Sequence, residues 1–287
     1  MKLRAGPRLI EWDERPLVMG IVNVTPDSFF DGGRFFDPEV AIAHAVRLAE
    51  EGADILDIGA ESTKPGSSPV GEHEELRRLI PVVTAVAKAV TIPISVDTSK
   101  ASVAKAAIDA GAVIVNDVTA LRGDSAMAAV VADAGAATVL MHMQGTPQTM
   151  QQAPFYRDVV KEVSAFFVER MQFAEERGIA RTHIILDPGI GFGKLLINNL
   201  DLLARLRAFT TFDRPVLLGV SRKAFLGKIT DRRVEDRLWG TAAAVALAVE
   251  QGAQIVRVHD VAPMLDVVKV AAAIARRNFS PLQVQHA

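Results

Sequence analysis

Polar side chains stand at the ends of several short, β-branched segments of this chain, where they could bind a ligand. Four of them come from four different segments: Asp97, Asn116, Asp187 and Lys223. A carboxylate accepts two parallel N–H bonds from a guanidine-like edge, an Asn amide donates and accepts, and a Lys donates to a carbonyl or ring nitrogen. Together they indicate a pocket for a flat heterocycle. An Asp–Lys salt-bridge network is the alternative, and Asp187 could also cap a helix.

A second group of polar residues has the character of an anion site. Ser221, Arg222 and Lys223 follow one apolar segment, and Arg257 and His259 come at the end of the next. Arg offers a planar fork to phosphate, and His is a neutral or charged donor. On its own His259 would be assigned to a cap or to the core, but its pairing with Arg257 favours phosphate binding.

The first apolar segment, about Val18 to Val24, leads into a loop that reads TPDSFFDGG. Its Thr, Pro, Asp, Ser and Gly residues are turn formers, and they stand beside two phenylalanines. Asn23 is the polar residue at which the apolar run breaks. This pattern predicts chemistry at the end of the first strand.

Residues 187–194 form a glycine-rich segment, DPGIGFGK, with glycines at positions 189, 191 and 193. Their spacing fits neither G-x-x-x-x-G-K-[ST] nor G-x-G-x-x-G, so we predict neither an NTP site nor an NAD site. We expect these glycines to let the backbone pass close to a planar ligand.

The elements that must position these residues alternate regularly. Short β-branched runs alternate with longer stretches rich in Ala, Leu and Val at helical period, which predicts repeated βα units and a parallel sheet. Strands are expected at about 18–24, 53–59, 93–97, 112–117, 136–143, 183–187, 215–221 and 253–260. Helices are expected at about 38–51, 72–90, 100–110, 125–134, 158–177, 198–209, 236–251 and 262–277.

Eight such units predict an α/β protein with the (β/α)8 TIM-barrel fold, and the strand-end residues would then meet at its C-terminal mouth. We predict a single domain, residues 1–287, with its core at about 16–278. An open doubly wound sheet remains possible, but it would more often carry a glycine fingerprint after its first strand, where this chain reads NVTPDS.

The composition excludes several classes of protein. The 287 residues, 49% of them hydrophobic, suffice for two ordinary domains or one barrel, and a net charge of -2 gives no basic field for nucleic acid or an anionic membrane. The absence of cysteine excludes a disulfide scaffold and a thiol nucleophile. The longest uncharged apolar stretch, 242–249, is far below the roughly 18 residues of a membrane span, and the charged N-terminus is unlike a secretory signal. We predict a cytoplasmic protein.

Several strings in this order resemble the dihydropteroate synthase family of folate biosynthesis. They are MGIVNVTPDSFFDGG, DIGAESTKPGS, SVDTSK, VNDVTAL, MHMQGTPQTMQ, DPGIGFGK, GVSRKAF and RVHDV, and they cover the chain from about Met19 to its last helix. The family's fold is the same barrel. The resemblance implies an alkyl-group transferase that joins 6-hydroxymethyl-7,8-dihydropterin pyrophosphate to p-aminobenzoate, giving 7,8-dihydropteroate and pyrophosphate. It also implies Mg²⁺ as cofactor, a homodimer and a target of sulfonamides.

The resemblance assigns roles residue by residue. The pterin would be held by Asp97, Asn116, Val118, Met141, Asp187, Phe192 and Lys223. Pyrophosphate would be held by Asn23, Arg257 and His259, with Asn23 also the metal ligand. p-Aminobenzoate would be held by Pro26, Phe29, Thr63, Lys64, Pro65 and Ser221. Asp31, Asp97 and Lys223 would be catalytic, with Asp31 on a first loop that closes over the reaction.

The chain departs from the family's pattern at a few positions. Ala60 stands where a second Gly is usual, and Lys64 stands where Arg is usual, so that loop offers a point charge in place of a planar fork. Leu195 and Asn198 replace the common Thr and His, and Ala224 replaces a common Ser.

Three other functions are compatible with part of this sequence. A methyltetrahydrofolate-binding methyltransferase domain shares the barrel and the pterin carboxylates but needs no anion site, so Arg257 and His259 argue against it. A catalytically silent pterin-binding paralogue is disfavoured by the intact first loop. A Schiff-base aldolase would use Lys223, but a loop Lys beside Arg222 suits a charged donor better than a desolvated amine.

Overall fold

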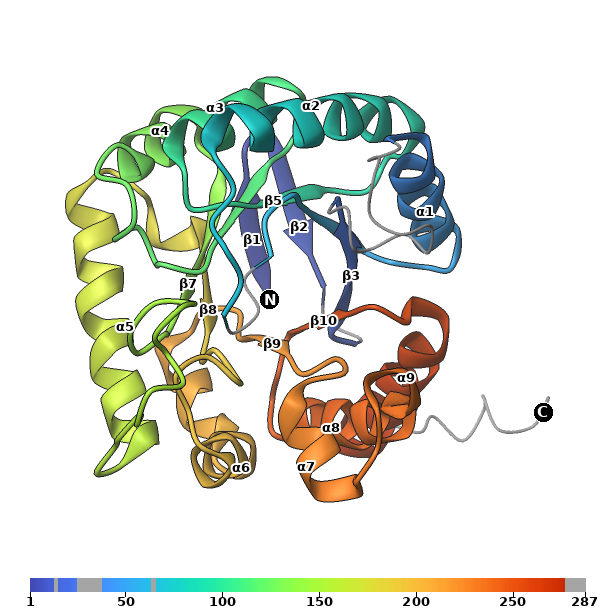
Figure 1. Cartoon of the computed structure of the whole chain (residues 1–287), viewed down its shortest axis with the longest axis vertical. Helices are drawn as coiled ribbons and strands as arrows, with labels where there is room; N and C mark the ends of the chain where they lie inside the picture. The colour runs from blue at the N-terminus through green and yellow to red at the C-terminus, as the bar shows by residue number, and fades with distance from the viewer. Residues whose placement is uncertain (13–14, 25–37, 63–65, 277–287) are drawn as a thin grey trace.

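The strands of this protein form one closed parallel barrel in the computed structural model, which describes residues 1–12, 15–24, 38–62 and 66–276 (Figure 1). The eight strands are hydrogen-bonded in the order β8-β7-β6-β5-β4-β3-β10-β9, and a parallel bridge between Leu186 and Val216 joins the two ends. Their bounds are β3 (Leu17–Asn23), β4 (Ile55–Gly59), β5 (Ile94–Asp97), β6 (Ile114–Asp117), β7 (Ala137–Met141), β8 (Ile184–Asp187), β9 (Leu217–Gly219) and β10 (Ile255–Val258). The predicted (β/α)8 barrel is confirmed.

Helices surround the strands, as Figure 1 shows. One follows each strand: α1 (Pro38–Glu50), α2 (Glu72–Ala89), α3 (Ala101–Asp109), α4 (Met127–Ala134), α5 (Val159–Glu176), α6 (Leu196–Ala204), α8 (Leu238–Glu250) and α9 (Val261–Arg276). Among the described residues, three short 3-10 turns supplement them, at Arg181–His183, Leu206–Phe212 and Val234–Asp236. The helix expected at 198–209 therefore begins earlier than predicted and gives way to a 3-10 turn.

One further helix, α7 (Ala224–Thr230), lies where a loop was expected between β9 and α8. Its sequence, AFLGKIT, is short, contains a glycine and lies between charged residues, so it lacks the length from which a helical period can be recognised. Burial of Phe225 and Leu226 against the main core holds it in place.

Strand residues alternate between the inside of the barrel and the helices. Along β4, Leu56 and Ile58 belong to the large core beneath the helices, whereas Ile55 belongs to a second core inside the barrel. Asp57, between Leu56 and Ile58, points inward and hydrogen-bonds to residues of β6 and β10. This period of two decides which strand residues can contribute to a site at the mouth.

The first residues, which precede the expected core of about 16–278, form a hairpin, β1 (Lys2–Ala5) paired antiparallel with β2 (Arg8–Glu11). Leu3 and Ala5 are fully buried in the interior core with Met19 and Ile255. Figure 1 shows the hairpin in the middle of the ring of helices. It fills the end of the barrel opposite the strand ends at which β3 to β10 stop.

The assignment of residues 1–287 to a single domain stays a prediction. No helix among the described residues is long and apolar enough to cross a membrane.

Candidate active site

Arg257 is the centre of the polar cluster inside the barrel mouth. Its Nε donates to Asp57 Oδ2 at 2.6 Å, and its Nη2 donates to Asp97 Oδ2 at 2.8 Å. Asn116 Nδ2 donates to the same Asp57 oxygen at 2.9 Å. Three predicted site residues from β5, β6 and β10 are therefore brought together, and Asp57 links two of them.

Asp57 is a functional candidate that the sequence analysis missed. Its side chain is fully buried, and within the described residues its Oδ1 has no hydrogen-bond partner. Functional residues were expected at the last residues of each strand, whereas Asp57 lies two residues before the end of β4. A charged residue inside an otherwise apolar strand, ILDIG, was the signal that could have identified it.

Burial acts strongly on the two carboxylates expected to hold the heterocycle. Burial raises the pKa of Asp97 to about 7, although the positive charge of Arg257 opposes the shift. Burial also raises the pKa of Asp187, against the lowering effects of the Gly189 N–H and of Lys223. Burial outweighs the effect of the neighbouring cations on both carboxylates, which favours a ligand that brings further N–H donors.

Lys223 and Phe192 form the other wall of the mouth. The Lys223 ammonium lies 4.2 Å from the centroid of the Phe192 ring, and burial lowers its pKa to about 8 while Asp187 opposes that shift. Phe192 belongs to a small buried cluster with Val118, Met141 and two further methionines, Met143 and Met150. The three apolar residues predicted for the pterin faces thus pack together beside the predicted lysine.

His259 and Ser221 form a pair at the ends of β10 and β9. The distance between His259 Nδ1 and Ser221 Oγ is 2.9 Å, and the His259 backbone N–H donates to the same hydroxyl at 3.2 Å. Burial and the charge of Arg257 lower the pKa of His259 to about 3, so the ring is neutral at pH 7. Ser221, expected to bind p-aminobenzoate, is therefore tied to a residue expected to bind pyrophosphate.

Arg222, expected in the anion site, has a different partner. Its Nε and Nη2 donate to the two carboxylate oxygens of Asp260 at 3.0 and 2.5 Å. A bidentate pair of this kind uses the planar fork that phosphate would need. Arg257 uses its Nε and Nη2 within the protein in the same way, so the role of Arg222 in the anion site stays a prediction.

Two glycines of the glycine-rich segment pack closely against other parts of the protein. A Cβ on Gly189 would lie 1.9 Å from the carbonyl oxygen of His142, and one on Gly193 would lie 2.3 Å from that of Gln144. Both glycines have positive φ, at 68° and 61°. They permit close approach of this loop to the segment after β7, and the expected close approach of the loop to a ligand stays a prediction.

Asn23 is the exposed last residue of β3, after six buried residues. An exposed amide at this mouth can present its carbonyl oxygen to a hard cation whose other ligands come from substrate and water. The described residues contain no cluster of three or more His, Cys, Asp or Glu side chains that could hold a metal alone. The donor set therefore fits Mg²⁺ shared with phosphate oxygens, not a site made by protein alone.

Several predicted residues lie outside the part of the chain that the structure describes. They are Pro26, Phe29, Asp31, Thr63, Lys64 and Pro65. Beside the second of these segments, Lys100 forms ion pairs with Glu61 and, at 2.6 Å, with the buried Glu75. Ala60 is itself fully buried.

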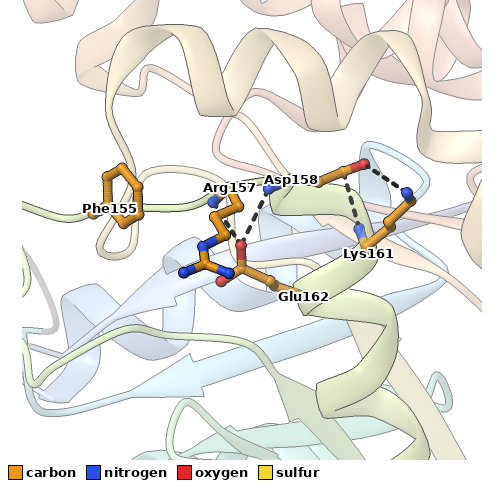
Figure 2. A pocket seen from close by; sticks show the side chains of 5 residues that line it. All are labelled: Phe155, Arg157, Asp158, Lys161 and Glu162. Carbon is orange, nitrogen blue, oxygen red and sulfur yellow. Dashed lines mark hydrogen bonds and ion pairs between the residues drawn. The ribbon is translucent and has the colours of Figure 1, made fainter.

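A surface hollow of about 440 Å³ lies elsewhere, at the start of α5 (Figure 2). Its polar groups serve the helix end: Asp158 Oδ1 accepts the N–H groups of Val160 and Lys161, and Glu162 accepts that of Arg157 at 2.7 Å. These capping bonds account for the hollow without a ligand.

Comparison with known proteins identifies the class and then the family. Residues 19–259 match the family described as pterin binding enzyme, so the chain is a pterin-binding barrel enzyme. Within that class, it is 46% identical over 258 residues to the dihydropteroate synthase of Escherichia coli strain K12, covering 90% of this chain and 91% of that protein. The chain belongs to the dihydropteroate synthase family, and the predicted family and enzyme function are confirmed.

Solved structures of relatives agree. The Yersinia pestis dihydropteroate synthase, in complex with a sulfonamide drug, has a TM-score of 0.91 at 41% identity, covering 97% of this chain and 100% of that one. The Xanthomonas albilineans enzyme, with 4-aminobenzoic acid, has a TM-score of 0.89 at 48% identity, covering 95% and 97%. The same enzyme has also been solved with 7,8-dihydropteroate, with a TM-score of 0.86 at 46% identity, covering 96% and 98%.

Proposed function

We propose that the barrel mouth condenses 6-hydroxymethyl-7,8-dihydropterin pyrophosphate with p-aminobenzoate, and that Asp97, Asn116, Asp187 and Lys223 hold the pterin. The observation that carries this assignment is the pair of buried carboxylates, Asp97 and Asp187, beside Asn116 at one end of the barrel. A pterin presents a 2-amino group and a ring N–H, which are the donors that such acceptors need. Val118, Met141 and Phe192 would cover its faces.

Pyrophosphate binding is assigned to Arg257, His259 and Asn23. Within the described residues, Arg257 engages the two aspartates through Nε and Nη2, so its Nη1 is the group that would face the anion. The neutral imidazole of His259 would donate one further hydrogen bond. Mg²⁺, held by Asn23 together with substrate oxygens and water, would neutralise charge on the leaving group.

The chemistry needs no strong base. The bond between the pterin methylene and the pyrophosphate oxygen breaks first, and both electrons leave with the oxygen. The buried carboxylates stabilise the cationic methylene left behind. The amine nitrogen of p-aminobenzoate, already a nucleophile when neutral, then forms the new C–N bond and loses a proton.

p-Aminobenzoate would lie near Ser221 and the segments that carry Pro26, Phe29, Thr63, Lys64 and Pro65. Support comes from the bond between Ser221 and His259, which sets the amine site next to the anion site. Asp31 would act with Asp97 and Lys223 once the first loop closes, excluding the water that would capture the cation.

The protein is further proposed to be a cytoplasmic homodimer. Exposed apolar side chains on α8 and α9 support a partner surface, since Trp239 is 80% exposed, Leu247 64% and Ile274 62%. Light scattering in solution measures this directly: the mass of one chain would overturn the dimer.

The test of function measures pyrophosphate and dihydropteroate together, with p-aminobenzoate or Mg²⁺ withheld in turn. We expect equal amounts of the two products and a large loss when either is withheld. Scrambling of an isotope label from the bridging oxygen in unreacted substrate would support early departure of pyrophosphate. Pterin binding without any turnover would instead favour the silent paralogue.

A further inference from the structure

Lys194 is a buried lysine at the end of the glycine-rich loop that carries Phe192. Its side chain lies in the protein interior, with 3% of the residue exposed. Its Nζ lies 2.9 Å from His142 Nδ1, 3.2 Å from the His142 carbonyl oxygen and 2.9 Å from the Phe192 carbonyl oxygen. An ammonium has three N–H donors, and these three acceptors match them in number.

His142 is suited to accept this bond. It lies directly after β7, and burial together with the charges of Lys194 and Arg122 lowers its pKa to about 2. The ring is therefore neutral, and a neutral ring that accepts at Nδ1 carries its proton on Nε2. Lys194 thus joins the end of β7 to the loop that follows β8.

The same loop is held at Gly191 and Gly193 by further bonds. Gly191 N–H donates to Asn199 Oδ1 at 2.7 Å, and Gln151 Nε2 donates to Gly191 O at 2.9 Å. The Tyr156 hydroxyl donates to Gly193 O at 2.7 Å. Of these donors, Lys194 is the one that can carry a charge. Burial lowers its pKa to about 7 while Asp187 opposes that shift, so the amine is an ammonium below that pH. Hydrogen bonds to charged groups are typically stronger than neutral ones.

The loop matters because of what it presents to the barrel mouth. Phe192 lies on it, and the Lys223 ammonium lies over the Phe192 ring. Asp187 begins the same segment, and its Oδ1 accepts the Gly189 N–H at 2.7 Å. A shift of this loop would move Phe192 and disturb its contact with Lys223 and the bond between Gly189 and Asp187.

We propose that Lys194 is a positioning residue of the pterin pocket, whose ammonium ties the glycine-rich loop to the end of β7 and so holds Phe192 and Lys223 in place for the pterin. The inference rests on the proposed function, because it takes that mouth to be the pterin site. Its acceptors are backbone and neutral imidazole, so its charge is not consumed in an ion pair with them. The ammonium also adds positive charge near Asp187, whose pKa it lowers.

The test compares Lys194→Met with Lys105→Met. The first removes the donors and the charge at similar length, whereas Lys105 is 65% exposed in a surface pair with Asp109. We expect Lys194→Met to lose about tenfold or more in affinity for a phosphate-free pterin by calorimetry, with the KM for p-aminobenzoate little changed. Lys105→Met should match the wild type in both.

Two further variants keep the test decisive if Lys194→Met does not fold. Lys194→Gln retains an amide donor. Tyr156→Phe removes the neutral hydrogen bond from the Tyr156 hydroxyl to Gly193 O in the same loop. Each variant should therefore weaken pterin binding by a smaller factor than Lys194→Met. Unchanged pterin affinity in the folded variants would overturn the proposal. Equal losses for pterin and p-aminobenzoate would do so as well, since they would indicate general damage.

The wild-type protein separates this proposal from the proposed function. Pterin affinity is measured without turnover, so a wild type that binds pterin but makes no dihydropteroate would defeat the synthase assignment alone. A wild type that binds no pterin would defeat both, and calorimetry detects this before any variant is made.

Discussion

Arg257 and Asp97 are joined by a charged hydrogen bond of 2.8 Å between Nη2 and Oδ2. The first residue is assigned to the pyrophosphate and the second to the pterin, so the two halves of one substrate are bound by residues in direct contact. Asp57, which accepts from Arg257 Nε, holds the guanidinium from the other side. A substitution of Arg257, Asp97 or Asp57 should therefore affect the binding of both the pterin and the pyrophosphate.

Asp57→Asn should weaken pyrophosphate binding by roughly tenfold, because the guanidinium loses one of its two anionic partners. It should also lower the free energy of unfolding by roughly 1 to 3 kcal/mol, since buried donors lose a charged acceptor. Calorimetry with pyrophosphate and denaturant unfolding measure the two effects. The control Asp109→Asn breaks an exposed pair and should change neither. Pyrophosphate affinity equal to that of the wild type would remove Asp57 from the site.

Asp97→Asn should cost pterin binding roughly ten- to hundredfold, since a charged hydrogen bond typically contributes ~1.5 to 3 kcal/mol. The amide keeps the shape of the side chain but can accept at one oxygen only. A titration with a phosphate-free pterin measures the loss. If that titration is unchanged, the pocket assignment is wrong.

Pterin affinity should be highest near pH 7. Burial raises the pKa of Asp97 to about 7, and the carboxylate must be ionised to accept two N–H bonds, so affinity rises as the pH approaches 7. Burial lowers the pKa of Lys194 to about 7 and that of Lys223 to about 8, and loss of either proton weakens binding as the pH rises further. Calorimetry with a phosphate-free pterin avoids titration of the ligand's phosphates. A profile that keeps its acid limb in Asp97→Asn would contradict this assignment.

The same carboxyl has an opposite effect on the stability of the ligand-free protein. Between the ordinary pKa of an Asp and about 7, the folded state binds more protons at Asp97 than the unfolded state does. The contribution of Asp97 to the free energy of unfolding therefore falls as the pH rises through this window. Ionisation of Asp97 lowers the free energy of unfolding of the ligand-free protein, and hydrogen bonds from a bound pterin can offset this loss.

Chelation of Mg²⁺ should weaken pyrophosphate binding and abolish turnover while leaving the affinity for a phosphate-free pterin unchanged. Asn23→Ala should reproduce this in part, by raising the Mg²⁺ concentration needed for half-maximal activity. The separation is expected because Asn23 lies at the exposed end of β3, whereas the pterin residues are buried. Activity that survives thorough chelation would dispose of the metal assignment.

The sequence predicted correctly that polar residues at the ends of parallel strands lie together. Asp97, Asn116 and Asp187 end or nearly end parallel strands, and parallel strands all end at the same mouth, so their convergence could be predicted. Asp57 was missed because it points into the barrel two residues before the end of its strand, where strand-end positions do not reveal it. Lys194 was missed because a lysine after glycines is usually solvated, and its burial depends on contacts with the distant β7 end.

The sequence did not show contacts between residues that lie far apart along the chain. Arg222 pairs with Asp260, 38 residues away, and nothing in the local string SRK indicates this. The glycines of the loop permit a close approach to the carbonyls after β7. The hairpin of β1 and β2 escaped notice because its strands have four residues each, too few for a clear period.

That hairpin constrains the order in which the protein can fold. Its own pairing is local and can form early, but Leu3 and Ala5 are buried against residues as distant in sequence as Ile255. A chain synthesised from its N-terminus therefore makes the hairpin first and gains its docking surface last, once β10 is available. Until then, the apolar side chains that seal the barrel remain exposed, and final closure is a late, long-range step.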